Sequence, residues 1–221
     1  MRLFPLFPLF PLFAILAMAV SLPALAQTSA DPAPAGTYHI DPAHTRLLFR
    51  VSHLGFSNYT AFFKSADATL IFDPDAPETM QLTATVNPAS VETLYPDPAF
   101  DFNATIAGTE LLDAVTFPQI TFTSTKIALT GEKTADVTGD LTLHGVTKPV
   151  TLSVTFNGGY AGHPMDAGAR IGFSATGSLM RSDFGMGYGI PAPGTTMGVS
   201  DEVGIVIETE FLNPDAPKTT E

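Results

Sequence analysis

The feature that most limits how this chain can fold is the alternation of apolar and polar side chains, repeated in segment after segment between residues 36 and 212. In residues 46–54, for example, Leu47, Phe49, Val51 and His53 share one face, and polar side chains occupy the other. A period of two is the spacing of a β-strand that buries one face. The pattern therefore predicts an all-β chain.

Seven further segments show the same period. Their apolar sets are Phe62, Ala66, Ala68, Leu70 and Phe72; Leu82, Ala84 and Val86; Ile120, Phe122, Ile127 and Leu129; Val137, Leu141 and Leu143; Val150, Leu152, Val154 and Phe156; Ile171, Phe173, Ala175 and Leu179; Val203, Ile205, Ile207 and Phe211. The change of phase between Phe122 and Ile127 predicts a β-bulge, because one inserted residue moves a strand's apolar set to the other face. About eight strands are expected.

Residues 100–114 break the strand pattern. Phe102, Ile106 and Leu112 fall loosely along one helical stripe, and Asp101 or Asn103 could cap the N-terminus of a short helix. Eight antiparallel strands can remove their exposed edges by closing into a barrel, whose interior holds packed side chains or one slender ligand. We therefore expect an eight-stranded antiparallel β-barrel in which this helical segment covers one mouth.

The two ends of the chain have a different composition from the middle. Residues 1–26 carry one positive charge at Arg2, none over residues 3–20, and a small-residue cleavage pattern ending at Ala26, which predicts a signal peptide. Prolines within the apolar run argue against a membrane-spanning helix. Residues 27–35 are predicted to be a linker, residues 36–212 the barrel domain, and residues 213–221 a polar C-terminal tail.

Charge and cysteine content exclude several classes of function. The chain has 22 acidic and 10 basic residues, a net charge of −12, so no nucleic acid partner is expected. It has no cysteine, which removes thiol nucleophiles, thiolate metal sites and disulfides. An exported domain of this size must then be held together by its core alone.

No motif for catalysis or metal binding stands out. Gly185, Gly187 and Gly189 are followed by Pro191 and not by a helix, which predicts a loop over residues 182–200 at a barrel mouth. The histidines show no metal-ligand spacing, although a site assembled from distant strands stays open. The acidic residues cluster in turns and at outward positions. We predict no catalytic residue, no metal and no cofactor.

Five sequence strings, in order, resemble the YceI-like family of exported bacterial proteins. They are Tyr38–Asp41 with His44, Val51–Gly55, Phe117–Phe122, Gly139–Val150 (GDLTLHGVTKPV) and Arg181–Gly185. The resemblance spans residues 37–211. It implies a lipocalin-like, eight-stranded barrel whose apolar tunnel holds a polyisoprenoid or similar long-chain lipid. Residues 105–112 depart from the His-Leu-Arg-like stretch that many members carry, so head-group preference is not implied.

A lipid tunnel needs a continuous apolar lining with few polar groups. The lining candidates are Phe49, Val51, Phe62, Phe72, Phe122, Leu141, Leu152, Phe156 and Phe173, each of which could equally be packed core. His53, on the same inward face, is either a buried histidine bonded to a hydroxyl or a contact for the ligand's polar end. Arg181 is the candidate cation for a charged head group, beside Arg46, Arg50, Lys64, Lys126 and Lys148.

The expected function is therefore that of a periplasmic protein which sequesters or carries a polyisoprenoid or similar amphiphilic lipid, without a catalytic step. One alternative is a hydrolase or isomerase that acts on such a lipid with an inward histidine as base. A second is a stress-related structural module with a solid core. Export predicts a periplasmic location, and a homodimer would be reasonable for a lipid binder.

Overall fold

The computed structural model describes residues 32–162 and 168–216 of this chain. The signal-peptide prediction for residues 1–26 lies outside the described residues. The strands are β1 (Gly36–Ile40), β2 (Arg46–His53), β3 (Ser57–Phe63), β4 (Ala66–Phe72), β5 (Gln81–Val86), β6 (Val91–Glu92), β7 (Ile120–Leu129), β8 (Thr134–Leu143), β9 (Val146–Tyr160), β10 (Ala169–Met180) and β11 (Val199–Asn213). The one α-helix in these ranges is α1 (Phe102–Ala107), and short 3-10 helices cover Pro42–His44, Pro77–Thr79, Pro88–Ser90 and Arg181–Phe184.

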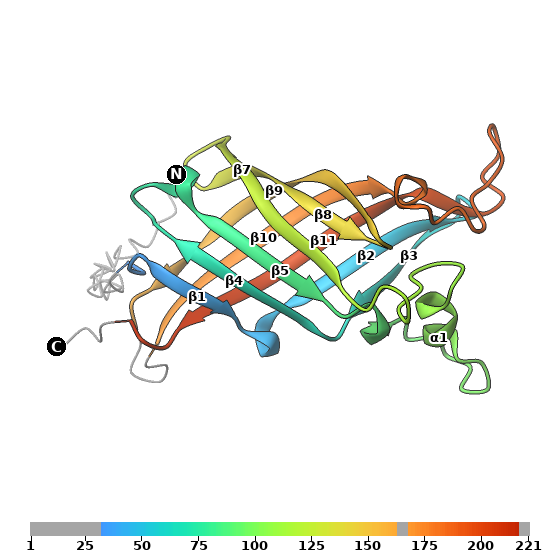
Figure 1. Cartoon of the computed structure of the whole chain (residues 1–221), viewed down its shortest axis with the longest axis horizontal. Coiled ribbons are helices and arrows are strands. Elements are labelled where there is room, and N and C mark those ends of the chain that lie inside the picture. The colour runs from blue at the N-terminus through green and yellow to red at the C-terminus, as the bar shows by residue number, and fades with distance from the viewer. Residues whose placement is uncertain (1–31, 163–167, 217–221) are drawn as a thin grey trace, which may run out of the picture.

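The sheet closes on itself. Its order is β1-β4-β5-β7-β8-β9-β10-β11, and β11 returns to pair with β1, so the ring has eight members, all antiparallel to their neighbours. Strands β2, β3 and β6 extend the ring lengthwise, because β2 pairs with β11 and β3, and β3 pairs with β6. Figure 1 shows the resulting elongated barrel. The predicted all-β, eight-stranded barrel is confirmed.

The structure has more strands than the eight of the closed ring because some long strands are interrupted. Only residues 41–45, which contain the turn Pro42–His44, separate β1 from β2, and only Lys64 and Ser65 separate β3 from β4. The second interruption changes the inward phase: Tyr59, Ala61 and Phe63 line the interior before it, and the buried positions after it are Ala68, Leu70 and Phe72. The predicted inward position of Phe62 is therefore wrong, because the step from Phe63 to Ala66 is three residues.

The predicted β-bulge is present in β7. The register between β7 and β8 shifts between Ser124 and Lys126. On the same two strands the ring of Phe122 lies over Gly139, where an added Cβ would come within 2.3 Å of that ring. Gly139 thus supplies the space that lets a phenylalanine fill the barrel interior.

A two-residue turn, His144–Gly145, joins β8 to β9. Both residues have positive φ, 51° and 74°, as the tight turn that suits twisted antiparallel strands requires. The ring of His144 packs on Phe117 at 4.8 Å between centroids, and its Nδ1 lies 3.0 Å from the carbonyl oxygen of Phe184. This contact ties the hairpin to the segment after β10.

The two ends of the barrel differ. At one end lie α1 and the loop 185–198, and at the other lie β1 and the last residues of β11 (Figure 1). The latter end is filled by an aromatic block, which consists of Tyr38, Phe72, Phe156, Phe173 and Phe211. Successive ring centroids in the block are 5.3–6.1 Å apart. Such contacts are favourable edge and tilted arrangements.

Residues from the predicted linker and tail complete this closed end. Ala33 and Ala216 are buried against the aromatic block. The hydroxyl of Tyr38, which is fully buried, donates a 2.8 Å hydrogen bond to the carbonyl oxygen of Pro34, and burial raises the pKa of Tyr38 to about 12. The folded unit therefore includes residues on both sides of the predicted domain 36–212.

Candidate functional site

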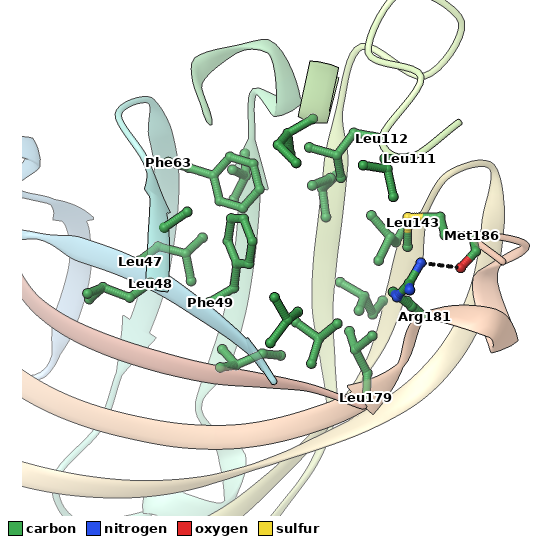
Figure 2. A pocket seen from close by; sticks show the side chains of 18 of the residues that line it. Leu47, Leu48, Phe49, Phe63, Leu111, Leu112, Leu143, Leu179, Arg181 and Met186 are labelled. Atoms are coloured by element: carbon green, nitrogen blue, oxygen red, sulfur yellow. Dashed lines mark hydrogen bonds between the residues drawn. The ribbon is translucent and has the colours of Figure 1, made fainter. Parts of the chain in front are cut away.

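The half of the barrel next to α1 encloses a cavity of about 690 Å³, referred to below as the barrel pocket. It is lined by residues from β2, β3, β5, β7–β11 and α1 and by residues of the loops at the α1 end, and nearly all of its surface is apolar. Figure 2 shows Leu47, Phe49, Phe63, Leu143 and Leu179 projecting into this space from several strands. A hollow with these properties suits an apolar ligand of moderate size.

Seven of the predicted site residues line the barrel pocket. They are Phe49, Val51, His53, Phe122, Leu141, Leu152 and Arg181. The six other than Arg181 follow directly from strand periodicity, because every second residue of β2, β7, β8 and β9 faces the interior. Whether they contact a ligand stays a prediction.

Four predicted site residues lie outside the lining: Phe62, Phe72, Phe156 and Phe173. Phe62 does not face the interior, because the inward residues of β3 are Tyr59, Ala61 and Phe63. The other three face inward as predicted, but they belong to the aromatic block at the closed end. Periodicity locates the inward face of a strand and carries no information on whether that level of the barrel is hollow or filled.

The pocket also has lining residues that were not predicted. Phe63 was missed because of the phase change, and the two consecutive polar residues Lys64 and Ser65 are the sequence signal that could have revealed it. Leu111, Leu112 and Met186 come from loops and lie on the side of the pocket where Leu143 and Arg181 lie (Figure 2). Loop residues follow no period, so no sequence pattern could have placed them.

Arg181 lies at the wall of the pocket with its donors already engaged. Its side chain is buried, and it donates to the carbonyl oxygens of Ser200 (Nε, 2.9 Å), Met186 (Nη1, 3.0 Å), Tyr188 (Nη1, 2.7 Å) and Val199 (Nη2, 2.9 Å). Burial lowers the pKa of the guanidinium, and the carboxylate of Asp201 acts in the opposite direction. Arg181 therefore holds the loop 185–198 onto the barrel. The sequence indicated it only as a cation for a charged head group and did not predict this structural role.

The remaining candidate cations lie away from the lining. Lys64 pairs with Glu92 at 3.1 Å and Lys148 with Asp183 at 2.7 Å, whereas Arg46 donates to backbone carbonyls. His53 is exposed at the rim of the pocket, so the expectation of a buried histidine bonded to a hydroxyl is wrong. His53 is the last residue of β2, at the edge of the pocket beside the turn that leads to β3, and its side chain is therefore exposed to solvent.

Helix α1 is attached beside the mouth by a polar network. Asp101 caps it by accepting a hydrogen bond from the Ala104 amide, as predicted. Asn103 Oδ1 accepts from the amide (2.8 Å) and hydroxyl (2.6 Å) of Thr93, and Asn103 Nδ2 donates to Glu92 (3.2 Å). The Leu94 amide, followed by Asn103 and Lys64, lowers the pKa of Glu92 to about 2. The helix thus covers one side of the mouth, as expected.

A second group of titratable side chains lies near the closed end. Oxygen or nitrogen atoms of Asp41, His44 and Glu210 come within 4.8 Å of one another, a spacing that a metal ion could use. Arg170 Nη1 donates to both carboxylates, at 2.9 Å for Asp41. Because a guanidinium pairs with both acids, the group is an ion-pair network that joins the turn after β1 to β10 and β11.

The fold and the pocket together define a closed up-and-down β-barrel. One end of the barrel holds an apolar pocket that opens to the outside, and the other end of the barrel is packed. No helix in the described ranges is long and apolar enough to cross a bilayer. The family model for the YceI-like domain matches residues 38–211, and the chain belongs to that family.

Relatives and solved structures agree with this assignment. A UPF0312 protein of Pseudomonas savastanoi pv. phaseolicola is 40% identical over 178 residues, which cover 80% of this chain and 88% of that protein. The crystal structure of Burkholderia cenocepacia BcnA has a TM-score of 0.65 at 28% identity and covers 77% of this chain and 98% of BcnA. The Campylobacter jejuni YCEI protein has a TM-score of 0.61 at 30% identity, covering 73% and 89%.

A more distant structure shows the same fold. It is described as a polyisoprenoid binding domain from Saccharophagus degradans and has a TM-score of 0.56 at 17% identity, covering 80% of this chain and 98% of that domain. At this identity the likeness concerns the fold alone.

Proposed function

We propose that this protein is an exported, periplasmic carrier that sequesters a polyisoprenoid or similar long-chain amphiphilic lipid, with no catalytic step. The observation that carries the proposal is the barrel pocket itself, about 690 Å³ with an almost wholly apolar lining. An empty apolar cavity of this size is costly to maintain in a packed interior, so a ligand that fills it would stabilise the fold.

The family supports the ligand class. The chain has a YceI-like domain, and a solved domain of the same fold is described as polyisoprenoid binding. The lining supports a ligand that is apolar along most of its length, because of the six candidate cations only Arg181 lines the pocket in the described part of the chain, and its donors hold backbone carbonyls. Export is supported by the pattern of residues 1–26.

The direct test is native mass spectrometry of the protein purified from its own periplasm, followed by solvent extraction of the bound molecule. A stoichiometric isoprenoid or long-chain mass is the expected result. A protein that carries no lipid and takes up no added prenyl or fatty alcohol would overturn the proposal. Conversion of the extracted lipid on incubation with the protein would contradict the absence of a catalytic step.

Two neighbouring substitutions sharpen the test. Ala84 lines the pocket, and Thr83, the preceding residue on β5, is exposed on the outer face. Ala84→Phe places a ring inside the pocket and should reduce the bound lipid at least about tenfold, because a smaller cavity buries less of the chain. Thr83→Phe adds the same ring outside and should leave the bound lipid unchanged.

A further inference from the structure

The barrel pocket ends within the barrel. Along β9 the inward residues run from Leu152, which lines the pocket, through Val154 to Phe156, which belongs to the aromatic block. Along β10 they run from Leu179 at the pocket through Ala175 to Phe173. On both strands the hollow part of the barrel gives way to packed aromatic rings within a few residues.

Phe156 and Phe173 lie just beyond the pocket lining, where the packed part of the barrel begins, and this pair is referred to below as the floor. They are direct partners across β9 and β10, and their ring centroids lie 5.3 Å apart. The register of the two strands shifts between Gly172 and Phe173, beside this pair. Behind the pair lie Phe72 and Phe211, at 5.9 and 6.1 Å from Phe156 and Phe173 respectively. A ligand chain that enters from the α1 end therefore reaches a packed region that begins with two rings, and these two rings are themselves supported by two more.

The volume sets how much chain fits above this floor. At about 30 Å³ for each water-sized group, a cavity of 690 Å³ accommodates about 20 to 25 carbon-sized groups. This corresponds to about four isoprene units of five carbons each. A chain with twice as many units would leave roughly half its length outside the barrel.

From this geometry we infer that the Phe156–Phe173 pair acts as a length gauge that selects prenyl and acyl chains of about twenty carbons. The inference rests on the proposed lipid-binding function and adds to it the size class of the ligand and the residues that determine that class. Selection arises because each carbon placed above the floor is removed from water, whereas carbons beyond the limit gain little.

The test is a set of displacement titrations with the complete exported protein and the fluorescent apolar probe N-phenyl-1-naphthylamine. The competitors are the prenyl alcohols geraniol, farnesol and geranylgeraniol, with two, three and four isoprene units, and solanesol, with nine. Affinity should rise at least about tenfold with each unit up to four and change less than about threefold between four and nine. A steady rise up to nine units would overturn the length gauge and leave the proposed function standing.

Failure of the proposed function gives a different result. If neither the probe nor any of the four alcohols binds, the pocket is not a lipid site and the inference falls with the function. If all four alcohols bind with equal affinity, the protein binds lipids but the floor does not measure their length.

Variants at the floor make the assignment specific. Phe173→Ala should deepen the pocket and increase the affinity for a five-unit alcohol, geranylfarnesol, over geranylgeraniol by at least about tenfold. Ile207→Phe, which adds a ring to a lining residue of the deep part of the pocket, should shift the preference toward farnesol and keeps the inference testable if Phe173→Ala fails to fold. Phe117→Ala removes an equal ring that packs on His144 outside the pocket lining, and its preference should match that of the unaltered protein. Unchanged length preference in both pocket variants would contradict the inference.

Discussion

The Nη1 atom of Arg181 lies 2.7 Å from the carbonyl oxygen of Tyr188, and this contact joins the end of β10 to a loop that lines the barrel pocket. The same guanidinium also holds carbonyls of Met186, Val199 and Ser200. A cation at the wall of an apolar pocket thus donates to backbone acceptors that are buried or partly buried, and it keeps one side of the mouth in shape.

Replacement of Arg181 by Met should destabilise the protein by roughly 2–4 kcal/mol, because four carbonyl oxygens lose a charged donor, one of them in a buried contact and three in partly buried contacts. Urea unfolding measures the free energy, and limited proteolysis should show faster cleavage within residues 185–198. Arg181→Lys keeps the charge but not the planar array of donors and should give an intermediate loss. Equal stability of Arg181→Met and the unaltered protein would show that the clamp is unimportant.

Asp41 should make stability depend on pH in the acid range. Burial of Asp41 disfavours its ionised form, but hydrogen bonds from His44, Arg170 and the Ala43 amide outweigh burial and lower the pKa from 3.8 to about 2. The folded protein therefore binds this proton more weakly than the unfolded chain. The resulting stabilisation, roughly 2 kcal/mol, is present above about pH 4 and is lost as the pH falls toward 2.

Urea unfolding of the Asp41→Asn variant between pH 2 and pH 5 checks this expectation. The variant should be less stable than the unaltered protein at pH 5 and should lose less stability on acidification. Asp140→Asn, which alters an exposed acid on β8, serves as the control and should keep the original acid dependence. The same acid dependence in Asp41→Asn as in the unaltered protein would refute the assignment.

Gly139→Ala should disturb both stability and the pocket. The new methyl group would approach the ring of Phe122 to 2.3 Å and the carbonyl oxygen of Thr123 to 2.6 Å, so the ring must move into the barrel pocket. We expect a loss of about 1–3 kcal/mol and weaker probe binding. At Gly187 an added Cβ meets nothing within 4 Å, and Gly187→Ala should change neither quantity. Thermal melting and probe titration of the two variants give the comparison.

Asn103→Ala should loosen helix α1 from the side of the mouth. The substitution leaves the amide and hydroxyl of Thr93, a buried residue, without their acceptor and removes a donor to Glu92. Hydrogen exchange should become faster in residues 101–112, and stopped-flow release of N-phenyl-1-naphthylamine should accelerate several-fold. Asn58→Ala, at an exposed position of β3, should leave both rates as they were. If the two variants release the probe equally fast, α1 does not control access.

Most of the inward faces could be predicted from residue order, because a half-buried strand must alternate. The cap at Asp101 and the bulge in β7 could be predicted for a similar reason: each depends on residues only a few positions apart. The assignment of Phe62 failed where a two-residue interruption changed the phase, an event that leaves only two exposed polar residues, Lys64 and Ser65, as its trace in the sequence.

The sequence by itself therefore determined the all-β class, the closed barrel and most of the inward side chains, since these depend on local period and on the need to remove sheet edges. Only the tertiary structure decided which level of the barrel is hollow. Phe122 and Phe156 both face the interior of the barrel. Phe122 lines the pocket, whereas Phe156 packs in the aromatic block. The difference arises from rings contributed by distant strands, and from loop residues whose approach no local pattern records.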